Sequence, residues 1–155
     1  MSLAEIYQNF CWRIESITPA SAISPANFRR NDHPLYMTDE QSPEDRIFVL
    51  YWDNGDEVED FSDLNQRWST VYFTLEVAYD ATRDLDKLHT LMTSDRNQII
   101  STLRDGSNFV GYDSGNTTTD INLKGRWFDG DEFDRDRETM WILRQTWKCK
   151  IAETE

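Results

Sequence analysis

One stretch of the chain, from Arg67 to Tyr79, alternates apolar and polar residues without interruption. Strict alternation predicts a β-strand with one face in a core, and neither glycine nor proline breaks it. The apolar face would hold Val71, Phe73, Leu75, Val77 and Tyr79, and the other face Trp68, Thr70, Tyr72, Thr74, Glu76 and Ala78. Because most strands have only about five or six residues, we expect this one to lie inside a sheet on which the other elements pack.

Two further regions predict helices. Residues 3–17 carry apolar side chains at spacings of three and four, which is typical of a helix with one buried face. Residues 84–92 and 95–105 follow a similar spacing, and Asp95 with Gln98 fits a capping box at the start of the second piece. The pattern is equally consistent with two short helices and with one central helix.

Three other segments predict strands. Residues 46–52 are compact and apolar, whereas 117–128 and 138–152 would form a long hairpin, with Gly125 marking a bulge. Because helices and strands do not alternate strictly, the sequence predicts a single α+β domain over residues 1–155. We expect a mostly antiparallel or mixed sheet of about four to five strands, packed by the N-terminal helix and by the central helix or helix pair.

The segment from 18 to 45 predicts a long irregular loop, because its apolar periodicity vanishes and all four prolines fall within it. Long loops inside small domains are usually functional or partly disordered. Residues 27–30 and 35–37 could form short extended or docking pieces there. We expect this loop to be the segment that meets a neighbouring molecule.

The charge balance excludes several partners. The chain has 16 Lys and Arg against 29 Asp and Glu, a net charge of −13. Binding to nucleic-acid phosphates or to an anionic membrane needs clustered cations, so neither is expected. No apolar run approaches the length of a membrane span. Such a protein either repels DNA or imitates it.

The cysteines and the N-terminus predict a cytoplasmic origin. Cys11 and Cys149 lie far apart in amphipathic segments, and we interpret both as small buried side chains in a reducing compartment. The N-terminal residues lack the basic start and apolar run of a signal peptide.

Catalytic motifs are missing from the sequence. There is no nucleophile elbow, no phosphate-binding loop and no Cys/His cluster. Of the two histidines, His33 falls in the long loop and His89 on the polar side of its helix. We therefore expect no enzymatic activity and no cofactor.

Two acidic segments could hold oxygen ligands for a divalent cation. Residues 53–56 predict a turn that closes a strand, and residues 129–136 predict an acidic connector between the last two strands. Neither segment matches a calcium-binding loop, and turns attract Asp, Asn and Gly for backbone reasons alone. Solvated turns are the favoured interpretation, and cation binding stays open.

The tryptophans divide into two groups. Trp141 and Trp147 share a strand face with apolar residues, which predicts a place in the core or in an interface. Trp68 and Tyr72 instead share a face with polar residues, which suggests cover by a helix or a subunit contact.

The order of these segments resembles a known family. A helix and a proline-rich loop precede Ile47–Trp52, Arg67–Tyr79, Asp95–Leu103 and the closing strand Trp141–Ile151. This succession resembles the tail terminator (tail completion) proteins of long-tailed bacteriophages. The resemblance covers most of the chain and is one of pattern, without a single diagnostic motif.

The resemblance implies a structural virion protein without catalytic residues. Such subunits would form a hexameric ring that ends tail-tube polymerisation and joins the tail to the head connector. The partners would be further copies of the chain, the tail tube protein and the neck proteins, first in the host cytoplasm and then in the virion. DNA would pass through without specific binding, because six copies would carry roughly −78 charges. Interface or lumen candidates are Asp53, Asp56, Glu57, Trp68, Tyr72, Asp129, Asp131, Glu132, Asp134 and Asp136.

Three alternatives stay open at this point. The chain could be another ring component of the neck or head–tail joint. It could be a small acidic protein that mimics DNA and inhibits a nucleic-acid-binding protein, which would bind in a salt-dependent way. It could also be an enzyme that uses a divalent metal held by its aspartates.

Overall fold

The fold is that of a computed structural model, which describes residues 3–31, 44–59, 66–104, 121–137 and 140–154. Within these ranges, two helices and five strands follow one another. They are α1 (Leu3–Glu15), β1 (Arg29–Arg30), β2 (Ile47–Glu59), β3 (Gln66–Asp80), α2 (Leu85–Arg104), β4 (Ile121–Arg137) and β5 (Met140–Thr154).

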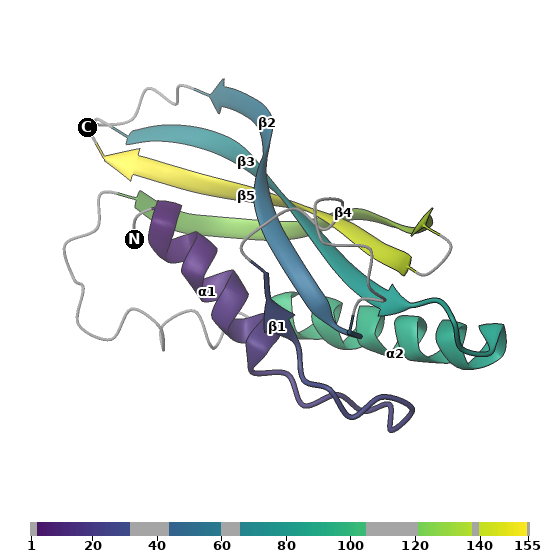
Figure 1. The fold of residues 1–155 in the computed structure, drawn as a ribbon. Helices are drawn as coiled ribbons and strands as arrows, with labels where there is room; N and C mark the ends of the chain where they lie inside the picture. Colours follow the sequence, from purple (N-terminus) through teal and green to yellow (C-terminus); the bar gives the residue numbers. More distant parts are fainter. Residues whose placement is uncertain (1–2, 32–43, 60–65, 105–120, 138–139, 155) are drawn as a thin grey trace.

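The strands form one mixed sheet in the order β1-β2-β3-β5-β4 (Figure 1). The short strand β1 is parallel to β2, and all other neighbours are antiparallel. β3 occupies the middle and pairs with β5 from Gln66 opposite Thr154 to Asp80 opposite Met140. The α+β class, the mixed sheet and the central place of the long strand are therefore confirmed.

Both helices pack against one face of the sheet. The apolar side chains of β3 from Val71 to Tyr79 are all buried there, as the alternation predicted. Phe10 of α1 meets Phe73 edge to face, with the ring centroids 5.2 Å apart. Trp147 is buried in the same core and Trp141 packs against it, so the core interpretation of these two residues is confirmed.

The opposite face of the sheet is only partly polar. Val49, Ala78, Met140 and Ile142 form a second buried apolar cluster on that face. The polar residues Thr74 and Glu76 of β3 are buried as well, so the two faces of this strand differ less in burial than the alternation predicted. Cys11 and Cys149 are both buried and free, which confirms that they are small buried side chains without a disulfide.

The helical predictions are confirmed with one correction. A single helix, α2, runs from Leu85 to Arg104, so the question of one helix or two is answered. The predicted capping box is wrong, because Asp95 lies inside α2 and is buried. The physical reason is a buried cation that pairs with its carboxylate, described below.

Two predicted connectors are strands instead. The turn expected at 53–56 is wrong: β2 continues to Glu59, with a shift of register between Asp53 and Glu57. The connector expected at 129–136 is also wrong, because β4 runs through it to Arg137. In both cases the long neighbouring strand offers hydrogen-bond partners to the backbone. β-bulges therefore accommodate the glycine and acidic residues, and the strand pairing continues beyond them. The bulge predicted at Gly125 is confirmed by a shift of register there.

The predicted loop 18–45 is only partly irregular. Arg29 and Arg30 form β1 within the extended piece expected at 27–30. The piece expected at 35–37 lies outside the described residues, as does His33. Within the described residues, no helix is long and apolar enough to cross a membrane.

Replacing Phe73 by alanine tests the core on the helix side of the sheet. F73A removes the ring that packs on Phe10 and leaves a cavity, so we expect the free energy of unfolding to fall by about 3–5 kcal/mol. Urea titration followed by tryptophan fluorescence measures the change. The control L85A, at a side chain that is 55% exposed, should change stability by less than about 0.5 kcal/mol. Equal losses in the two variants would contradict this description of the core.

Candidate functional site

Arg46 is a fully buried residue that lies directly before β2 and joins several elements of the fold. Its φ of 66° is left-handed, a conformation that costs a residue with a side chain about 1–2 kcal/mol. The backbone is held there from two sides. Its N–H donates to the carbonyl of Ala78 at 2.9 Å, and its own carbonyl accepts from the N–H of Arg29 at 3.0 Å. Arg46 therefore links the entry of β2 to β3 and to the entry of β1.

The guanidinium of Arg46 forms a two-point ion pair with Asp95 of α2. Nε donates to Oδ2 at 2.8 Å and Nη2 donates to Oδ1 at 3.0 Å. Both side chains are fully buried. Tyr79 of β3 donates its hydroxyl to the same Oδ2 at 2.8 Å. The cluster thus ties the helix α2 to two strands of the sheet.

The same guanidinium also holds the first part of the predicted loop. Nη1 donates to the carbonyl of Ser24 and to that of Ala26, the latter at 2.9 Å. Nη2 reaches the carbonyl of Ser21 at 3.4 Å, and the guanidinium lies 5.8 Å from the centre of the Phe28 ring. Arginine has five N–H donors, and these contacts use all of them.

A second set of contacts surrounds this cluster. The side-chain amide of Gln98 donates to the carbonyl of Thr18 and accepts from the N–H of Ala20, both at 2.9 Å. Asp45 accepts from the N–H of Asp80 at 2.8 Å and forms an ion pair with Arg83. The segment that follows α1 is therefore attached to α2 at its start and to Arg46 further along.

This cluster is built to hold structure and not to react. Burial, followed by the negative charge of Asp95, raises the pKa of Tyr79 well above its ordinary value of 10.0, so its hydroxyl keeps its proton. The carboxylate of Asp95 already accepts three hydrogen bonds. A general base or nucleophile needs a lone pair that can reach substrate, and this carboxylate is fully buried.

Sequence reasoning missed this cluster, although a signal was present. Asp95 lies on the helix face that also carries Leu91, Met92 and Ile99, all of them buried. A carboxylate within an apolar helix stripe requires a buried cation, because an unpaired buried charge is costly. Arg46, at the start of an apolar strand, is the residue that meets this requirement.

The predicted interface or lumen residues fall in two separate groups. Asp53, Asp56 and Glu57 lie in β2, and the register brings Asp53 next to Tyr72 of β3. The acidic group of β4 lies at the other edge of the sheet, with β3 and β5 between the two groups. The members of this second group are Asp129, Asp131, Glu132, Asp134 and Asp136. Of all the predicted residues, the structure describes only the side chain of Tyr72, which is half-buried.

Tyr72 belongs to the sheet face opposite the two helices. Trp68 takes a position on the same face by strand alternation. Cover of Tyr72 by α1 or α2 is therefore wrong, since both helices pack on the other face. On this face Glu76 accepts from the hydroxyl of Tyr51 at 2.6 Å and from Nη2 of Arg144 at 3.3 Å. The result is a polar row across β2, β3 and β5.

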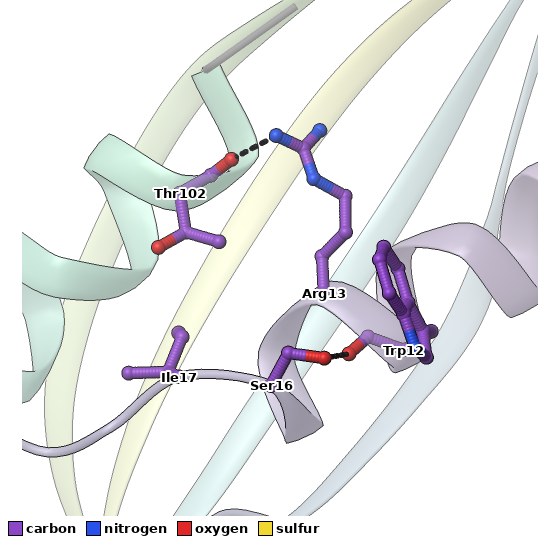
Figure 2. A pocket seen from close by; sticks show the side chains of 5 residues that line it. All are labelled: Trp12, Arg13, Ser16, Ile17 and Thr102. Atoms are coloured by element: carbon purple, nitrogen blue, oxygen red, sulfur yellow. Dashed lines mark hydrogen bonds between the residues drawn. The ribbon is translucent and has the colours of Figure 1, made fainter. Parts of the chain in front are cut away.

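A small pocket opens where α1 and α2 end (Figure 2). It has a volume of about 160 Å³, and its lining residues are Trp12, Arg13, Ser16, Ile17 and Thr102. Arg13 donates to the carbonyl of Thr102 in the last turn of α2, where the helix dipole favours a cation. Pockets for drug-sized ligands have volumes of about 300–1,000 Å³, so this hollow is too small to serve as one.

Metal binding gains no support from the residues that the structure describes. Among them, no group of three or more His, Cys, Asp or Glu side chains is placed to hold an ion. His89 is exposed on α2, as predicted, and its ring lies edge to face with Trp141 at 6.0 Å.

Comparison with known proteins shows a shared fold. No protein-family model matches the chain, and no curated protein matches it. The structure is similar to a chain in the solved structure of the virion of a native gene transfer agent (GTA) particle, with a TM-score of 0.52. The likeness covers 96% of this chain and 92% of that chain, with 16% identical residues. At this identity the likeness shows the fold alone.

Removing the charge of Asp95 tests the buried ion pair. D95N keeps the shape of the side chain but leaves the buried guanidinium of Arg46 without its counter-charge, so we expect a loss of about 3–5 kcal/mol in unfolding free energy. The control D86N changes an exposed carboxylate in the first turn of the same helix and should cost less than about 1 kcal/mol. Urea titration at neutral pH compares them. A loss in D95N no larger than in D86N would show that the pair is not important for stability.

Tyr79 should make the free energy of unfolding fall at alkaline pH. Its pKa is higher in the folded state than the ordinary 10.0, so the stability it contributes is full below that pH and is lost as the pH rises above it. Y79F cannot ionise and lacks the hydrogen bond to Asp95, so it should be less stable by about 1.5–3 kcal/mol at pH 7. Unfolding free energies measured from about pH 7 to 11 should show this difference shrinking above about pH 10. A constant difference would contradict the assignment.

Proposed function

We propose that this chain is a structural protein of a virion, and specifically a tail terminator. Copies of it would form a ring that ends tail-tube polymerisation and joins the tail to the head connector. The observation that carries the proposal is the fold likeness to a chain of a gene transfer agent virion, which is a phage-like particle. That likeness extends over 96% of this chain and 92% of the other, so it involves the whole subunit and not one motif.

The finer role rests on the resemblance in the order of segments. The segments quoted for the tail terminator resemblance fall in β2, β3, α2 and β5, in that order and after α1. Such a succession of elements supports a tail terminator more than it supports an unrelated α+β domain. It is equally compatible with another ring component of the neck.

The buried polar residues support a structural role over a catalytic one. Arg46, Asp95 and Tyr79 bind one another and the backbone of the segment from Ser21 to Ala26. Their side chains form a rigid connection inside the subunit. A rigid subunit with its polar groups engaged in this way suits a protein that presents fixed surfaces to several partners.

The charge distribution supports passage of DNA without binding. Each copy carries a net charge of −13, and acidic residues lie in both β2 and β4, toward the two edges of the sheet. A ring of such subunits would repel a phosphate backbone at any surface that it turns toward the DNA. The partners would then be the tail tube protein and the neck proteins, with assembly in the host cytoplasm before incorporation into the virion.

The native mass of the purified protein tests this proposal. The monomer has a mass of 18.3 kDa, and a head-to-tail interface closes into a ring when the rotation between copies allows it, so the proposed hexamer should appear at about 110 kDa. Light scattering behind a sizing column, at several protein concentrations, measures the mass. A ring-sized species supports the terminator and the related neck proteins. A strict monomer at every concentration would favour the small acidic DNA mimic instead.

A further inference from the structure

The segment that follows α1 is the longest stretch of the chain without a charged residue. It runs from residue 16 to residue 28, in a chain in which 29% of the residues are charged. We call its residues 18–28 the neutral loop. In Figure 1 this loop extends beyond both helices to the lower edge of the view. Because the centres of protein interfaces are depleted of charged residues, the neutral loop is suited to be a contact surface.

The exposed side chains of the neutral loop are mostly apolar. Ile23 is 41% exposed, and Ala20, Ala22 and Pro25 are exposed as well. A single exposed apolar side chain is ordinary, but here several follow one another along one loop. Ile23 is the largest of them and therefore the one that can anchor a contact.

The backbone on both sides of Ile23 is fixed from inside the protein. Arg46 donates to the carbonyls of Ser21 and Ser24, which precede and follow Ile23. The side chain of Gln98 on α2 holds the start of the loop. A loop that is fixed before association loses less conformational entropy when it binds. The buried cluster thus presents Ile23 in a preorganised position.

The hollow at the ends of α1 and α2 has the size of one such side chain. Its volume is about 160 Å³. A cavity of about 150 Å³ can hold a molecule as large as benzene, so there is room for one aliphatic side chain. Trp12 is 44% exposed and Ser16 is exposed, so the rim is accessible (Figure 2). The lining residues include no carboxylate, and Arg13 is buried with its guanidinium on the carbonyl of Thr102.

We propose that Ile23 of one copy inserts into the hollow of a second copy of this chain. Size and charge identify this occupant together. Copies with a net charge of −13 repel one another, so they approach most closely where neither side brings a carboxylate. The neutral loop and the lining of the hollow both meet this condition. The inference rests on the proposed function and names a subunit contact within it.

The geometry of this contact suits a ring. Ile23 is not among the residues that line the hollow of its own copy, so the contact joins unlike patches of neighbouring copies. An exposed apolar side chain that fits a pocket elsewhere on another copy makes such a head-to-tail contact. Repetition of the contact closes a ring when the rotation between copies allows it.

Disulfide cross-linking tests the contact directly. I23C and S16C are purified separately, mixed and oxidised with copper phenanthroline. A disulfide needs Cα atoms about 4.4–6.8 Å apart, so we expect linked dimers in the mixture and only background linking in either variant alone. The native Cys11 and Cys149 are buried and should not react. L85C is the matched control for S16C, because Leu85 is exposed on α2 outside the hollow, and it should not link to I23C.

Removing the side chain of Ile23 tests the contribution of the contact to assembly. I23A should raise the midpoint concentration of assembly at least about tenfold, because each contact loses a buried apolar side chain. L85A is the matched control and should assemble like the unchanged protein, since Leu85 is 55% exposed and belongs to neither surface. Light scattering at several concentrations measures the masses, and thermal unfolding checks that each variant is folded.

The outcomes separate this inference from the proposed function. If I23A forms the ring-sized species at the same concentrations as the unchanged protein, and I23C does not link to S16C, the inference is wrong and the ring proposal stands. If I23C links to itself as readily as to S16C, the contact joins like patches, which contradicts the inference. If the unchanged protein is a monomer throughout and no link forms, both are wrong.

Discussion

The rest of the structure depends on the buried ion pair between Arg46 and Asp95. Two charges taken out of water are costly, and only close pairing with full hydrogen bonding makes such an arrangement tolerable. Here the arginine uses all its donors: two on the carboxylate and three on the carbonyls of Ser21, Ser24 and Ala26. The pair holds α2 on the sheet, fixes the entry of β2 in a left-handed conformation, and attaches the segment after α1.

A core organised in this way determines which surfaces are left for partners. The helices occupy one face of the sheet, and α2 is held there by charge as well as by apolar packing. The other face has a buried apolar cluster around Met140 and Ile142 and a polar row in which Glu76 binds Tyr51 and Arg144. Such an arrangement of surfaces suits the assembly role proposed above.

Much of the fold could be predicted because it follows from local periodicity. The periodic patterns of the strand around Phe73 and of both helical regions can be recognised in the sequence without tertiary information. The order of these elements then indicates the α+β fold class. The turn at Asp53 and the connector at Asp129 were wrong because strand pairing with a long neighbour overrides local turn preference. Asp95 was misassigned for a related reason. A capping carboxylate and a buried one look alike in sequence, and only the partner, Arg46, distinguishes them.

The most direct test of the central claim is the shape of the purified assembly in the electron microscope. If the chain is a ring-forming virion subunit, class averages of negatively stained particles should show closed rings of uniform size, six-fold when viewed along the axis, with an open centre. Closure distinguishes a ring from the open filaments that other head-to-tail contacts generate. Open filaments of variable length, or compact two-fold dimers without a central opening, would contradict the account.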